Sequence, residues 1–311
     1  MKMRLAISCL ATLLLSTSAL SAPKVIASIM PVHSIVAAVM GDVGTPQLIY
    51  SGKNSEHSAS LSTQQISDLG KADVVFMNGG GLELKLGQIS GNESVNGKKF
   101  FALTGAPGIK TLKIREGGAF EADDDEELPA TTDDQYEFAK KYNVHFWLDP
   151  ENAKAMTKAV AAELGRIDPQ HGKTYESNAK AYLASLDQLE ADISTETKSI
   201  QGKPFIVFHD AYPYFEKRFG LEALGSISDA NAASPSAKRL KEIRDKIAAA
   251  KAVCVFREPQ FDAKFVRVAM EGTNAKSGIL DPMGYDVAPG PKAYEEMMRN
   301  LAKSAKDCLM N

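Results

Sequence analysis

Short apolar runs alternate with amphipathic stretches along most of the chain after residue 23. Six runs are typical of buried strands: KVIASIM (24–30), TPQLIY (45–50), ADVVFMNG (72–79), PFIVF (204–208), AVCVFRE (252–258) and SGILD (277–281). Stretches with helical spacing of apolar residues lie at 34–41, 61–70, 149–165, 211–219, 240–252 and 293–309. The alternation predicts an α/β protein with mainly parallel sheets and helices on both faces.

A much longer amphipathic stretch separates the two halves of this pattern. No proline occurs between Gly172 and Ile200, and apolar side chains recur at spacings of three and four: Tyr175, Ala179, Tyr182, Leu186, Leu189 and Ile193. This pattern predicts one helix with a single apolar seam, reaching about 40 Å at about 1.5 Å per residue. A coiled-coil dimerisation segment would show a similar seam, but the position between two α/β halves favours a rigid connector in a monomer.

The length of 311 residues also indicates more than one core. We expect a first α/β domain over 22–170, a connecting helix over 171–201 and a second α/β domain over 202–311. The stretch 116–137 interrupts the first domain with ten carboxylates and no basic residue. Such a composition predicts a solvated acidic loop.

The first 21 residues have the pattern of a secretory signal peptide. Lys2 and Arg4 precede an apolar run from Leu5 to Leu15, and small or polar residues follow up to a cleavage position before Ala22. The run is too short to span a bilayer as a helix. Cys9 lies inside the run, so it does not resemble a lipid-attachment cysteine. We therefore expect cleavage of residues 1–21 and a periplasmic mature protein.

Charge and cysteine content agree with export. Removing the signal peptide changes the net charge from −3 to −5, because 34 basic residues then face 39 acidic ones. No basic patch stands out, so nucleic acid is not an expected partner. Cys254 and Cys308 are the two cysteines left, and an oxidising compartment favours a disulfide between them. Two unrelated buried thiols are the alternative.

Four potential metal ligands lie where expected strands give way to helices or turns. His57 follows the run 45–50, His209 directly follows the run 204–208, and Asp281 ends the run 277–281. His145 lies in VHFWLDP (144–150), where period-two alternation predicts an extended segment.

Ligands bind at the carboxyl ends of strands in parallel sheets, and a cleft between two domains could gather all four residues. Three imidazoles and one carboxylate suit Zn²⁺, whereas Mg²⁺ and Ca²⁺ prefer oxygen ligands. The alternative is that these histidines are unrelated hydrogen-bonding caps at strand ends. Residue type alone does not decide, since His33 and His171 are interpreted as structural or surface residues.

Several motifs together resemble one known family, the periplasmic zinc-binding proteins of ABC importers, in the ZnuA-like branch of the cluster A-I (cluster 9) solute-binding proteins. The matching segments occur in the family's order: SIMPVHSIVAAVMGD (28–42), SEHSASLSTQQISDLGKADVVFMNGGGLE (55–83), HFWLDPENA (145–153), FHDAYPYF (208–215), FREPQF (256–261) and GILDPMG (278–284). The resemblance implies two α/β domains joined by a long rigid helix, with a metal site in the interdomain cleft.

The resemblance also implies which residues bind the metal. It assigns His57, His145 and His209 as direct zinc ligands, with Asp281, Glu56 or water in the fourth position. Manganese-binding relatives tend to carry a carboxylate at the third position, so His209 favours zinc. Zinc-binding members usually have a histidine-rich loop where this chain has the acidic loop 116–137, which contains no histidine.

The function implied is zinc capture in the periplasm and delivery to an inner-membrane ABC permease with its cytoplasmic ATPase. A manganese- or iron-binding member of the same family is one alternative. A zinc-dependent hydrolase is another, because three histidines and an open position also form catalytic zinc sites. We expect no enzymatic activity, since the sequence contains no HExxH motif or evident nucleophile–base pair.

Overall fold

The structure, a computed structural model, describes residues 22–52, 55, 57–58, 60–91, 99–120 and 134–310. The expected signal peptide, Glu56 and most of the expected acidic loop lie outside these residues. The helices are α1 (Met30–Met40), α2 (Thr63–Lys71), α3 (Leu84–Ser90), α4 (Asp134–Ala139), α5 (Pro150–Ile167), α6 (Gly172–Thr197), α7 (Pro213–Phe219), α8 (Ala237–Ala250), α9 (Lys264–Met270) and α10 (Ala293–Met310). The strands are β1 (Val25–Ala27), β2 (Gln47–Leu48), β3 (Val74–Met77), β4 (Phe100–Ala102), β5 (Phe205–Ile206), β6 (Cys254–Arg257) and β7 (Lys276–Ile279).

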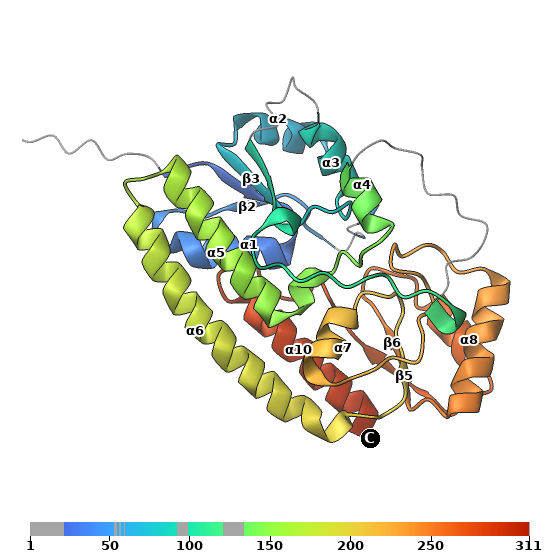
Figure 1. The fold of residues 1–311 in the computed structure, drawn as a ribbon. Helices are drawn as coiled ribbons and strands as arrows, with labels where there is room; N and C mark the ends of the chain where they lie inside the picture. The colour runs from blue at the N-terminus through green and yellow to red at the C-terminus, as the bar shows by residue number, and fades with distance from the viewer. Residues whose placement is uncertain are drawn as a thin grey trace, which may run out of the picture.

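Two separate parallel sheets form the centres of two α/β domains (Figure 1). The first sheet has the order β2-β1-β3-β4 and the second the order β5-β6-β7, with parallel pairing throughout. Parallel neighbours require crossover connections, which the intervening helices supply. The predicted fold class is confirmed. The domain boundaries expected at residues 170 and 202 stay predictions.

The long helix α6 runs along one side of the molecule, past both domains (Figure 1). All six residues of its predicted apolar seam are buried. The seam packs against α5 and α1 of the first domain and against α10, the last helix of the chain. The helix ends in a 3-10 turn, η7 (Lys198–Ile200). One continuous helix therefore supports both halves of the molecule.

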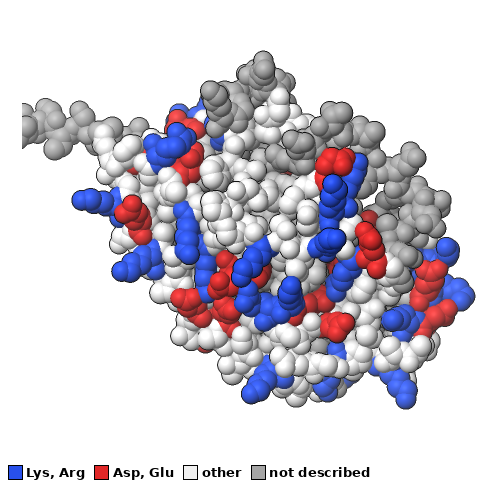
Figure 2. Space-filling model, viewed as in Figure 1, with Lys and Arg blue, Asp and Glu red and all other residues white. Residues whose placement is uncertain are grey.

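Ion pairs also tie the helices of the two domains together. Arg218 of α7 binds Asp149, which caps α5, with an Nε–Oδ1 distance of 2.7 Å, and lies 3.3 Å from Glu190 of α6. Lys154 of α5 lies 3.1 Å from the same Glu190. Figure 2 shows basic and acidic side chains side by side over these helices. The two domains are thus joined by polar as well as apolar contacts.

The segment 144–150 differs from its prediction. It forms a 3-10 turn, η6 (Phe146–Leu148), and not an extended strand. Residues on both expected faces are buried. The alternation in the sequence therefore does not separate a buried face from an exposed one. The turn is closed by local bonds, including one from the Asn152 side chain to the carbonyl oxygen of Phe146 at 3.0 Å. The prediction of an extended segment was wrong because the segment is buried on all sides, and among the described strands none pairs with it.

A disulfide joins Cys254 of β6 to Cys308 of α10, with the two Cα atoms 6.0 Å apart. The predicted pairing is confirmed in the structure. The bond attaches the last helix to the central strand of the second sheet.

Among the helices that the described residues form, none is both long enough and apolar enough to cross a membrane.

Candidate metal site

Three histidines far apart in the sequence converge at one point. His57 lies in a turn between β2 and α2, His145 directly precedes η6, and His209 follows β5. The Nε2 atom of His145 lies 3.3 Å from that of His57 and 3.1 Å from that of His209. One ring nitrogen from each residue lies within 4.8 Å of the other two. The structure therefore brings together the three histidines that the sequence singled out.

Two of these imidazoles are held by hydrogen bonds to their other ring nitrogen. His209 Nδ1 lies 2.7 Å from Glu258 Oε1, and His145 Nδ1 lies 3.0 Å from Asn143 Oδ1. Both partner atoms are acceptors, so each Nδ1 carries the hydrogen and donates it. Each Nε2 then carries the lone pair. Partners of this kind fix the tautomer and the orientation of metal-binding histidines.

Sequence reasoning missed both partners. Glu258 follows β6 and is completely buried beside β5, the strand that leads to His209. Asn143 is also completely buried, two residues before His145. For Glu258 the sequence offered one signal, a carboxylate at the end of an expected strand, but it did not show that this strand pairs with the strand that leads to His209. Asn143 offered none, because an asparagine near a turn is common.

Burial and neighbouring imidazoles keep the rings of His57 and His145 neutral. Burial, and then the nearby His209, lowers the pKa of His57 to about 3. Burial, followed by the charges of His209 and His57, lowers the pKa of His145 well below its usual value. Neutral imidazoles are the form that binds metal. Nitrogen lone pairs that face each other at such short distances repel one another unless a proton or a cation lies among them.

Asp281, one of the expected fourth ligands, is not part of this cluster. Asp281 Oδ1 accepts hydrogen bonds from the backbone N–H groups of Met283 (3.1 Å) and Gly284 (2.8 Å). Burial raises the pKa of its carboxyl. Asp281 is not in the group of ring nitrogens that lie within 4.8 Å of one another. Glu56 lies outside the described residues, so the fourth ligand stays a prediction.

Aromatic rings surround the cluster. The ring centroid of Trp147 lies 5.1 Å from that of His145, and the centroid of Phe261 lies 5.5 Å from that of His209. Tyr212 approaches His209 at 6.4 Å. Tyr214 donates a hydrogen bond to the carbonyl oxygen of Asn143 at 2.7 Å. These rings limit the access of water to the imidazoles.

The two remaining histidines lie elsewhere. His33 is buried in α1 and its Nε2 lies 3.0 Å from the carbonyl oxygen of Pro46. His171 is partly exposed, and its Nδ1 lies 2.7 Å from Asp168 Oδ2. Their interpretation as structural and surface residues agrees with these positions.

Comparisons with known proteins agree with the motifs. The family model described as zinc-uptake complex component A, periplasmic (ZnuA), matches residues 25–308. The high-affinity zinc uptake system protein ZnuA of Brucella abortus (strain 2308) is 42% identical over 305 residues, covering 92% of this chain and 91% of its own. The protein of the same name from Yersinia pestis is 32% identical, with 96% and 95% covered.

A solved structure has the same fold. The periplasmic zinc-binding protein TroA from Treponema pallidum superposes with a TM-score of 0.76 at 20% identity, over 93% of this chain and 99% of its own. Because the family model covers nearly the whole chain and the relatives align with it almost from end to end, the chain belongs to the ZnuA family of periplasmic zinc-uptake components.

Proposed function

We propose that this protein captures Zn²⁺ in the periplasm and delivers it to the permease of a zinc-importing ABC transporter. His57, His145 and His209 hold the ion in this proposal. The convergence of one ring nitrogen from each of the three histidines within 4.8 Å is the observation that carries it. The names of the relatives, which describe high-affinity zinc uptake, support the identity of the cargo.

The donor set favours zinc over other common divalent ions. Three neutral imidazole nitrogens suit a tetrahedral Zn²⁺ site, whereas Mg²⁺ and Ca²⁺ prefer oxygen ligands. Asp281, Glu56 or a water molecule completes the coordination. Manganese or iron is the second candidate cargo, because metal availability can override affinity order.

Binding rather than catalysis is the role that we propose for the site. The family is one of solute-binding transport proteins. The buried aromatic rings and orienting hydrogen bonds serve to hold a cation. In this proposal residues 1–21 are a signal peptide that is cleaved, and the mature protein is a monomer. Its partner is an inner-membrane permease with its ATPase.

Chelator competition on the mature, metal-free protein tests this function. We expect one tight Zn²⁺ site and weaker Mn²⁺ binding in the unmodified protein. His145→Ala and His209→Ala should each weaken zinc binding by at least about 100-fold, since even orienting partners of metal ligands are worth 10–100-fold. His171→Ala, which removes a partly exposed histidine far from the cluster, is the matched control. Weak zinc binding that none of the three substitutions changes would refute the proposal.

A further inference from the structure

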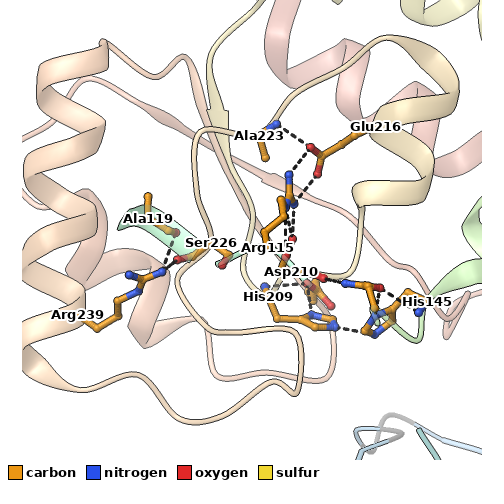
Figure 3. Close-up of polar contacts among 11 residues, drawn as sticks. Arg115, Ala119, His145, His209, Asp210, Glu216, Ala223, Ser226 and Arg239 are labelled. Atoms are coloured by element: carbon orange, nitrogen blue, oxygen red, sulfur yellow. Dashed lines mark hydrogen bonds and ion pairs between the residues drawn. The ribbon is translucent and has the colours of Figure 1, made fainter. Parts of the chain in front are cut away.

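A half-buried arginine of the first domain lies between two carboxylates of the second (Figure 3). Arg115 Nε donates to both carboxylate oxygens of Asp210, at 2.9 and 3.1 Å, and its Nη2 donates to Asp210 as well. The other edge of the guanidinium binds Glu216, with Nη1–Oε2 at 2.8 Å and Nη2–Oε1 at 3.0 Å. The Asp210 and Glu216 side chains are only 2% and 5% exposed. This planar fork holds two carboxylates in a fixed relation, which a lysine could not do.

Asp210 is also connected to two of the candidate metal ligands. It directly follows His209 in the chain. Its backbone carbonyl oxygen accepts a hydrogen bond from Asn143 Nδ2 at 2.5 Å. The other end of the Asn143 amide, Oδ1, accepts from the backbone N–H and from Nδ1 of His145, each at 3.0 Å. A continuous set of bonds therefore runs from Arg115 through Asp210 and Asn143 to His145. Figure 3 shows Arg115, Asp210, His209 and His145 along this set.

The segment that carries Arg115 is fixed at both ends. On one side, Ile114 N–H donates to the carbonyl oxygen of Lys141 at 3.2 Å, within the first domain. On the other side, the carbonyl oxygen of Ala119 accepts from Arg239 Nη2 at 2.7 Å and from the backbone N–H of Ser226 at 3.0 Å, within the second. The guanidinium is therefore held in place by its backbone as well as by its partners.

We propose that Arg115 is a positioning residue for the metal site, which fixes the separation of His145 and His209 by holding Asp210, the neighbour of His209 in the chain and the partner of Asn143. This inference rests on the proposed function of the three histidines. Removing Arg115 leaves two buried carboxylates without their shared cation, which is strongly unfavourable. The carboxylates then move apart or move towards water. Because Asp210 adjoins His209 and bonds to Asn143, that movement displaces the ligands relative to each other.

The test compares Arg115→Gln and Arg115→Lys with Arg218→Gln. Arg218 is a matched control, since its side chain is 25% exposed against 22% for Arg115. It also joins two carboxylates, Asp149 and Glu190, across elements of both domains. None of the bonds described for these two carboxylates reaches a histidine of the cluster. The measurements are the melting temperature of the metal-free protein, the rate of Zn²⁺ release to excess chelator and the visible spectrum of the Co²⁺-loaded protein.

We expect Arg115→Gln to release zinc at least about 10-fold faster and to change the Co²⁺ bands, which report coordination geometry. Arg115→Lys retains the charge without the fork, so both effects should be present but smaller. Arg218→Gln should lower the melting temperature and leave the spectrum and the release rate unchanged.

Unchanged Co²⁺ bands and release rate in Arg115→Gln would overturn the inference and leave Arg115 with a purely structural role. If Arg115→Gln does not fold, the lysine variant decides, and wild-type behaviour of that variant overturns the inference. Failure of the unmodified protein to bind either metal would overturn the proposed function and this inference with it.

Discussion

The three imidazoles of the cluster disfavour a positive charge on one another, but together they offer nitrogen ligands to a cation. Charging one ring makes it harder to charge the next, and burial adds to this cost. The pKa values of His57 and His145 are both lowered for these two reasons. At neutral pH the rings of His57 and His145 are therefore already deprotonated, so neither has to release a proton in the zinc site that we propose.

This protonation state predicts a shallow pH dependence of zinc affinity. Three unperturbed histidines with pKa values of about 6.5 would lose ~1000-fold in affinity between pH 7.5 and 5.5, because each must release a proton first. A lowered pKa moves that competition to lower pH. With His57 and His145 still neutral at pH 5.5, their two contributions to the loss disappear, so we expect a loss well below ~1000-fold. Competition titrations at both pH values, corrected for protonation of the chelator, measure it, and a loss near ~1000-fold would contradict the lowered pKa values.

Among single residues, the sequence revealed the three histidines but not the groups that hold them. His57, His145 and His209 could be found because histidine is rare in this chain, with five in all, and each follows an apolar run or a turn signal. Glu258 is one of many carboxylates. Only the pairing of β5 with β6 places it beside His209, and that pairing cannot be seen in a linear sequence.

At the scale of elements, length favoured recognition without deciding it alone, since α7 has only seven residues and lies within the predicted stretch 211–219. The helix α6 has 26 residues, so its seam repeats often enough to be recognised. The helices α3 and α9 have seven residues each and were absent from the prediction, because two turns give too few repeats to show a period. The turn η6 was taken as extended for a related reason, since a short run that is buried on all sides shows no informative alternation.

The disulfide is the element-scale feature with a measurable effect on stability. It links β6 to α10 across 54 residues of sequence. A closed loop of that size restricts the unfolded chain and can stabilise the fold by up to about 4 kcal/mol. We expect Cys254→Ala together with Cys308→Ala to lower the free energy of unfolding by about 2–4 kcal/mol, as measured in denaturant.

Zinc affinity should change little in this double variant, because pairing with β5 and β7 still holds β6 in place, and Glu258 directly after it stays beside His209. Reduction of the unmodified protein provides a control that adds no cavity and should give a similar loss. Equal unfolding free energies for oxidised and reduced protein would show that the bond contributes nothing.

At the scale of the whole molecule, both domains are supported from one side. The helix α6 contacts α1, α5 and α10. Between the domains, Trp147 Nε1 donates to the carbonyl oxygen of Pro282 at 2.9 Å, and Tyr294 donates through its hydroxyl to the carbonyl oxygen of Trp147 at 2.7 Å. A hinge motion would have to break these buried contacts together.

We therefore expect zinc to alter the overall shape very little. Small-angle scattering should give radii of gyration for the metal-free and zinc-loaded proteins that agree within about 1 Å, a difference typical of preorganised binding. Any shift should come from the region around His57, the half-buried member of the cluster. A decrease of several ångströms on adding zinc would indicate domain closure and contradict the bracing role of α6.

The bracing by α6 affects how the empty and zinc-loaded forms compete for docking at the permease. If the empty and loaded forms have nearly the same shape, a permease that recognised only that shape would bind both with equal affinity. Equal affinity would not select the loaded form. Empty protein would then compete with loaded protein for the same docking position. Under zinc starvation, when most copies are empty, the ratio of the two forms would limit the rate of import as much as the supply of the ion itself.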